Sequence, residues 1–169
     1  MVARHMKHIR SGLGLSWDNR AALTLHELGE LIRRAGKEVG LIPLSEHKIK
    51  VNASEHVKKI DWVWVAKVGD RPVVAFEIEG PRVPKKSIVN DVRKFKKCEA
   101  EISIVALFHV DHDLSEKPYP PYKRDPKEWV RSHEEDFDFE IYFDEELMAK
   151  NGIEAIQKDA MRALKKRNN

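Results

Sequence analysis

The sequence contains a single cysteine, Cys98, among its 169 residues. One thiol cannot form an intrachain disulfide, so a disulfide-stapled scaffold is excluded. The sequence also lacks any apolar run close to the roughly 20 residues that a membrane-spanning helix needs, and it shows no signal peptide. We therefore expect a soluble, cytoplasmic protein with no membrane partner.

Neither sign of charge dominates the sequence. Charged residues make up 35% of the chain, and their near balance leaves a net charge of +3. This mild basicity permits nucleic-acid binding without requiring it. No internal repeat is present, and the length fits a single domain, residues 1–169, that can bury a real core. The sequence leaves the oligomeric state open, a homodimer included.

Two apolar, β-branched stretches, residues 60–68 and 73–78, predict adjoining strands at the centre of a sheet. Gly69-Asp70 supplies turn chemistry between them. Both stretches are apolar on both faces, as expected for strands covered on two sides. A carboxylate in such a strand costs free energy unless something binds it. Three acids nevertheless occur there: Asp61, Glu77 and Glu79.

The register of this hairpin decides whether the three acids meet. Glu77 and Glu79 are two residues apart, so they share one face of their strand. A two-residue turn would put Asp61 opposite Ile78 and on the other face. An odd-numbered loop or one bulge puts Asp61 opposite Glu77 or Glu79, and we expect this arrangement. The three carboxylates then form an oxygen-lined site suited to Mg²⁺ or Mn²⁺. The alternative is a polar-capped hairpin whose acids pair with nearby lysines.

Apolar residues at helical spacing predict helices over residues 19–35, 85–100 and 152–167. Gly36 and Gly40 are expected to end the first helix. Residues 41–45 predict a turn into a weaker strand over 47–52, and residues 101–109 predict a further buried strand. The helix between two buried strands predicts parallel pairing in the sheet. Residues 137–143 alternate strictly, which indicates a half-exposed edge strand.

The helix over residues 85–100 carries many cations directly after the three acids. This clustering of one sign predicts phosphate contacts, and the alternative is a solvated helix face. Asn90 and Asp91 sit between the cations and could form hydrogen bonds toward the site. The candidate nucleic-acid-binding residues are Lys86, Arg93, Lys94 and Lys97.

Four further candidates lie outside the hairpin. Glu27, at the edge of the apolar face of the first helix, is the acid best placed to reach a site on the sheet; a solvated glutamate is the alternative. The stretch 109–113 offers histidines and acids for a metal, but a polar strand end is the better interpretation. Residues 116–124 interleave aromatics and cations, which suits base stacking, although a proline-stiffened surface loop is favoured. The basic residues of 1–15 are best interpreted as a frayed terminus rather than a phosphate-touching arm.

The predicted element order, with Ile60-Asp61 opening one central strand and Glu77-Ile78-Glu79 ending the next, resembles the PD-(D/E)XK nuclease superfamily over residues 19–110. The resemblance implies an α/β, restriction endonuclease-like α-β-β-β-α-β core. Its mixed central sheet would be flanked by helices, with a C-terminal strand and helix within residues 111–169. It further implies a Mg²⁺-dependent endonuclease acting on DNA. Asp61 matches the first acid of the motif, Glu77 the second, and Glu27 a first-helix glutamate.

Glu79 departs from the superfamily pattern, because lysine usually stands at this position. Some type II restriction enzymes carry a similar E-x-E ending, and in other members a lysine of the following helix takes over. Lys86, Lys94 or Lys97 can fill that role here. The mechanism implied is metal-assisted phosphodiester hydrolysis, with Asp61, Glu77 and Glu79 holding the metal. The competing classes are a non-catalytic nucleic-acid-binding module on the same scaffold and a regulatory protein whose basic helix contacts an acidic partner.

Overall fold

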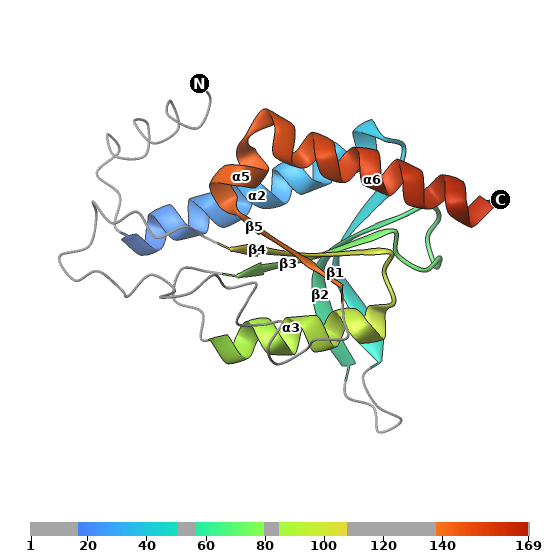
Figure 1. Ribbon diagram of the computed structural model, residues 1–169. Coiled ribbons are helices and arrows are strands. Elements are labelled where there is room, and N and C mark those ends of the chain that lie inside the picture. The colour runs from blue at the N-terminus through green and yellow to red at the C-terminus, as the bar shows by residue number, and fades with distance from the viewer. Residues whose placement is uncertain (1–16, 51–56, 80–84, 108–137, 169) are drawn as a thin grey trace.

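A computed structural model describes residues 17–50, 57–79, 85–107 and 138–168 of the chain. Helices cover both faces of one five-stranded sheet (Figure 1). The strands are β1 (Ile42–Lys50), β2 (Val57–Val65), β3 (Val74–Glu79), β4 (Ile102–Leu107) and β5 (Glu140–Phe143). The helices are α2 (Trp17–Glu38), α3 (Lys85–Cys98), α5 (Asp144–Met148) and α6 (Lys150–Asn168).

The sheet is mixed, with strand order β1-β2-β3-β4-β5. The pairs β1–β2 and β2–β3 are antiparallel, whereas β3–β4 and β4–β5 are parallel. The parallel pairing across α3 confirms the crossover predicted from the sequence. Strand β5 stands last in the order, which confirms its prediction as an edge strand. The α/β class with a mixed sheet between helices is therefore confirmed.

Two apolar clusters lie on opposite faces of the sheet. One joins α2, α5 and α6 to the sheet, and the other lies between α3 and the sheet. Figure 1 shows these helices on opposite faces of the sheet. The first cluster includes Leu28, Ile32, Trp64, Phe76, Leu147 and Ile156. The second includes Val63, Ala75, Ile88, Val92, Phe95 and Val105. Burial on both faces explains why most residues of β2, β3 and β4 are apolar, outside the exposed start of β2 and the acids.

Helix α2 continues through Gly36, so the prediction that Gly36 ends the helix is wrong. A Cβ atom at Gly36 would lie 2.7 Å from Nε1 of Trp64, so only glycine lets this indole approach the helix. The same Nε1 donates a hydrogen bond of 3.1 Å to the carbonyl of Ile32. The helix ends before Gly40, whose φ of +76° is unfavourable for other residues.

Strand β1 begins at Ile42, so the predicted turn over residues 41–45 is also wrong. Pro43 lies within the strand and pairs with Trp64 of β2. Strand β1 stands first in the sheet order, and a proline is tolerated at such an edge because its missing N–H removes no bond from the sheet interior. Helix α5 has no counterpart among the predicted elements. Within the described residues, no helix is long and apolar enough to cross a membrane.

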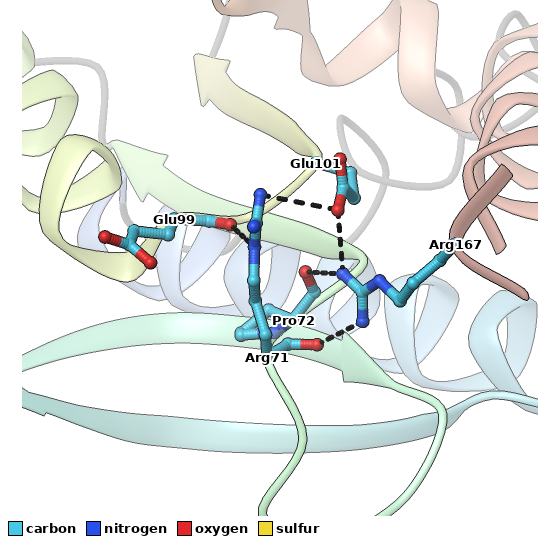
Figure 2. A network of polar contacts seen from close by, with 5 residues as sticks. All are labelled: Arg71, Pro72, Glu99, Glu101 and Arg167. Atoms are coloured by element: carbon cyan, nitrogen blue, oxygen red, sulfur yellow. Dashed lines mark hydrogen bonds and ion pairs between the residues drawn. The ribbon is translucent and has the colours of Figure 1, made fainter.

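Two arginines join three segments where β3 begins (Figure 2). Arg167 of α6 donates to the carbonyls of Arg71 and Pro72 at 2.8 and 3.1 Å and pairs with Glu101 at 3.1 Å. Arg71 pairs with the same carboxylate at 3.3 Å and donates to the carbonyl of Glu99. We call these contacts the arginine network. It ties the β2–β3 connection and the start of β4 to the end of α6.

Candidate functional site

The hairpin register brings the first predicted acid opposite the second. Trp62 pairs with Phe76, and Trp64 pairs with Val74. One further step in this register puts Asp61 opposite Glu77, as expected for an odd-numbered connection. The predicted register, which an odd-numbered loop or one bulge produces, is therefore confirmed.

Asp61 is held at the end of the β2–β3 ladder by a backbone contact. Its Oδ2 accepts a hydrogen bond of 2.7 Å from the amide of Ile78. The regular pairing of β2 with β3 stops at Trp62, so the Ile78 amide has the carboxylate of Asp61 as its acceptor in place of a backbone carbonyl of β2. The contact fixes Asp61 beside the end of β3 that carries Glu77 and Glu79.

Glu77 and Glu79 lie on the face of the sheet that α3 covers. Ala75, two residues before Glu77, packs in the cluster beneath α3, whereas Phe76 packs in the opposite cluster. Strand alternation therefore turns both glutamates toward α3. Glu77 is only 2% exposed, and Glu79 is half-buried.

Helix α3 adds an acid and a cation to this face. Lys94 Nζ lies 2.6 Å from Oε1 of Glu77 and 2.8 Å from Oδ1 of Asp91. The Lys94 side chain is 16% exposed, and those of Glu77 and Asp91 are 3% and 4% exposed. We call Asp61, Glu77, Glu79 and Asp91 the acid cluster. Lys94 is the cation in contact with it.

Burial and repulsion between carboxylates disfavour ionisation of Asp61, Glu77 and Glu79. Burial, with repulsion from Asp61 and Asp91, raises the pKa of Glu77 to about 8 in spite of the Lys94 contact. Burial and a contact with Asp91 raise the pKa of Glu79 to about 9. Burial also raises the pKa of Asp61, against the opposing effect of the Ile78 amide. Glu77 and Glu79 therefore favour protonation at neutral pH unless more positive charge arrives.

Two buried oxygens of the acid cluster have no hydrogen-bond partner among the described residues: Oδ2 of Asp91 and Oε1 of Glu77. Lys94 lies at ion-pair distance from Oε1 of Glu77, but its direction of approach does not make a hydrogen bond. Buried polar atoms are normally satisfied, because leaving one unpaired costs roughly 1–3 kcal/mol. Oδ2 of Asp91 is therefore available to a further ligand, whereas Oε1 of Glu77 already has the Lys94 ammonium beside it.

The acid cluster fits a divalent cation by donor type and by charge. Carboxylate oxygens are the ligands that Mg²⁺ and Mn²⁺ prefer, and among the described residues four acids face the ammonium of Lys94. In the part of the chain that the structure describes, however, no group of three acids, histidines or cysteines is arranged to hold a metal ion as it stands. The Lys94 ammonium lies between Glu77 and Asp91, two of the oxygen donors.

The predicted nucleic-acid-binding residues fall on two sides of α3. Arg93 and Lys97 are exposed on its outer side. Lys94 instead points inward and pairs with two acids, so it does not fit the surface phosphate contact predicted for it. It does fit the other role predicted from the sequence, a helix lysine beside the second acid. Lys86 belongs to α3, but its side chain lies outside the described residues.

Glu27 is not brought to the acid cluster. It lies on α2, and the neighbouring Leu28 packs against the opposite face of the sheet. The position of Glu27 therefore does not support the prediction that it reaches the site on the sheet. The candidates at 1–15, 109–113 and 116–124 lie outside the described residues.

The sequence predicts only a hydrogen bond from Asp91 toward the site. The structure instead buries Asp91 in the acid cluster, where it is 3% exposed. The sequence carries a stronger signal for this residue. Ile88, Phe95 and Cys98 mark the seam of α3 that packs on the sheet, and Asp91 falls on this seam at the same three- and four-residue spacing. A lone acid on the buried seam of a basic helix indicates a site residue.

Comparison of the chain with models of protein families, with curated proteins and with solved structures finds no match. The site must therefore be interpreted from its own residues.

Proposed function

We propose that this protein is a metal-dependent nuclease with a restriction endonuclease-like core, and that it hydrolyses phosphodiester bonds of DNA. The observation that carries the proposal is the meeting of Asp61, Glu77 and Glu79 on one face of adjacent strands, in the register that the sequence predicted. The observed order α2-β1-β2-β3-α3-β4 supports the same proposal, because it is the order that the superfamily resemblance implies.

The chain would supply three kinds of group to the reaction. Asp61, Glu77 and Glu79 would hold Mg²⁺ or Mn²⁺ through carboxylate oxygens. Such an ion lowers the pKa of bound water and offsets negative charge on the phosphate. Glu79, which replaces the usual lysine, would accept a proton from the attacking water. Lys94 would bring the positive charge that Glu79 cannot, because its ammonium already lies beside Glu77.

The outer side of α3 would bind the phosphate backbone. Arg93 and Lys97 are exposed there, on the same helix that carries Asp91 and Lys94 on its inner side. Cations on this surface would bring the backbone close to the acid cluster. Phosphate contacts of this kind position a nucleic acid without selecting its sequence.

A plasmid-nicking assay tests the proposed reaction. We expect the purified chain to nick DNA with Mg²⁺ or Mn²⁺ and to lose this activity in EDTA. Glu77→Gln should abolish the nicking, which excludes a contaminating nuclease. If the wild-type protein neither nicks DNA nor changes its melting temperature with either ion, the proposal is wrong.

A non-catalytic module on the same scaffold is the second candidate, and two contacts favour it. Asp61 caps the amide of Ile78, and Lys94 pairs with Glu77, as in a polar-capped hairpin with a purely structural role. Such a module would bind nucleic acid and would leave it intact with either metal. The excess of acids over cations and the unsatisfied oxygens of the acid cluster favour the enzyme.

Salt dependence tests the binding surface separately from the chemistry. We expect Arg93→Gln with Lys97→Gln to weaken DNA binding and to flatten the log–log salt dependence by about one unit for each phosphate that the variant no longer neutralises. Lys37→Gln with Lys67→Gln, at two exposed positions away from α3, is the matched control. An unchanged slope in the α3 double variant would reduce this helix face to ordinary solvated charge.

A further inference from the structure

Asp91 occupies a position where a carboxylate is costly. It is the only acid within α3, and it lies on the side of the helix that packs on the sheet, beside Ile88 and Val92. Asp91 is 3% exposed. A buried carboxylate destabilises the fold unless charge and hydrogen bonds compensate for the lost water.

That compensation is incomplete at Asp91. Oδ1 has the Lys94 ammonium at 2.8 Å, and the carboxyl group also contacts Glu79, whereas Oδ2 is buried and has no hydrogen-bond partner in the described part of the chain. The same ammonium lies 2.6 Å from Oε1 of Glu77. Two elements of the fold, β3 and α3, thus present buried carboxylates on either side of one positive charge, and Oδ2 of Asp91 has no partner among the described residues.

We propose that Asp91 is a further ligand of the cation site, and that the Lys94 ammonium is a counter-ion that a divalent cation displaces from between Asp91 and Glu77. The ligand class is a small, hard divalent ion, because every donor is a carboxylate oxygen. This inference rests on the proposed function and deepens it. It adds a ligand from a second element and gives the lysine a defined role in cation binding.

The side chains differ in their freedom to move. Glu77 is fixed in the middle of the sheet, and Asp91 has a short side chain on a packed helix. Lys94 carries its charge on a flexible four-carbon stem and is the group best able to leave. An ion of charge +2 also compensates crowded carboxylates better than an ammonium of charge +1. Once displaced, the ammonium would be free to contact a substrate phosphate.

Calorimetric titration of the full-length, EDTA-treated protein with Mn²⁺ alone tests the proposal. We expect Asp91→Asn to bind Mn²⁺ roughly tenfold or more weakly, because changes around metal sites typically cost 10- to 100-fold in affinity. Lys94→Met should bind Mn²⁺ more tightly than the wild-type protein, because the competing charge is gone. The matched control is Asp159→Asn, since Asp159 makes the same i,i+3 pair with Arg162 at 2.8 Å on the exposed side of α6. It should bind like the wild type.

The outcomes separate this inference from the proposed function. If Asp91→Asn keeps the wild-type affinity, Asp91 is not a ligand, and nuclease activity of the wild type is untouched by that result. If Lys94→Met binds Mn²⁺ no more tightly, the displacement is wrong. If the wild type does not bind Mn²⁺ and does not cleave, both proposals fall together. Should Asp91→Asn fail to melt cooperatively, Lys94→Met alone decides, because it leaves every carboxylate in place.

Discussion

The arginine network and the acid cluster lie toward opposite ends of β3 and treat their charges in opposite ways. In the arginine network two guanidinium groups share one carboxylate and also donate to backbone carbonyls. Among the described residues, the four acids of the acid cluster face the ammonium of Lys94, and the buried Oδ2 of Asp91 has no hydrogen-bond partner. The arginine network pairs its polar groups with one another, whereas the acid cluster leaves buried polar groups incompletely paired.

This difference separates a structural role from a binding role within one sheet. The fold can pair a polar group where nothing else has to enter, as Arg167 shows at the start of β3. At the end of β3 it keeps like charges together in a buried place, which costs stability. Buried charge that persists in a fold without full compensation is a reason to expect a ligand.

The largest difference between the two regions is expected in cleavage, when one glutamate of each region is replaced by glutamine. Glu77→Gln should lower cleavage by roughly a hundredfold or more, because charge that stabilises the transition state is lost. Its melting temperature in EDTA, measured above pH 8 where Glu77 is ionised, should be equal or higher, since one of several crowded charges disappears. Mg²⁺ should raise the melting temperature of the wild type and not of Glu77→Gln, because a ligand stabilises only the state that binds it.

Glu101→Gln is the control for that substitution. It removes a carboxylate of the arginine network, so it should leave cleavage and the Mg²⁺ effect as in the wild type. The measurements are plasmid nicking and paired thermal melts. An equal loss of cleavage in both variants would show that Glu77 acts only through general folding.

The pH dependence of stability should also differ between the acid cluster and the arginine network. The pKa values of Glu77 and Glu79 rise from 4.5 to about 8 and about 9 on folding, so the folded protein keeps protons that the unfolded chain releases. In EDTA, this contribution to the free energy of unfolding is present in full below pH 4.5 and is lost as the pH rises to about 9.

Urea denaturation between pH 5 and pH 9 measures this effect. Glu77→Gln with Glu79→Gln should flatten the decline of stability with pH, because neither side chain then titrates. Glu101→Gln should keep the wild-type slope. A double variant that declines as steeply as the wild type would assign the pH dependence to other groups.

The smallest effect is expected in the arginine network. Arg167→Gln removes bonds to two carbonyls and a carboxylate, and net hydrogen-bond contributions of this kind suggest a loss of about 1–2 kcal/mol in the free energy of unfolding. Denaturant melts at low and high salt measure it, and the ion-pair part should shrink with salt. Cleavage should not change, and a cleavage defect would remove the distinction between the two regions.

Local patterns explain which parts of this fold are predictable. The β-branched runs of β2 and β3 and the helical spacing in α3 act over a few residues, so the hairpin, the crossover and the convergence of Asp61 with Glu77 follow from the sequence. The role of Gly36 does not, because it depends on Trp64 from a distant strand. The place of Pro43 does not either, because its tolerance depends on β1 being an edge strand, which only the sheet order establishes.

The inner and outer sides of α3 are the hardest part of the site to predict. Lys94 and Lys97 look alike in sequence, yet Lys94 turns inward because Glu77 and Asp91 offer it two carboxylates. That attraction depends on a strand and a helix packing together. A charge count along the helix cannot detect it, whereas the position of Asp91 on the apolar seam can.

The single thiol of the sequence can report how often α3 leaves the sheet. Cys98 is 7% exposed where α3 meets the sheet, and burial raises its pKa to about 11, so the folded protein shields a poorly reactive sulfur. A motion that lifted the whole of α3 off the sheet would expose this sulfur and would also break the contact between Lys94 and Glu77. The rate at which a reagent modifies the thiol therefore counts openings of the acid cluster, and cations that hold the cluster closed should slow it.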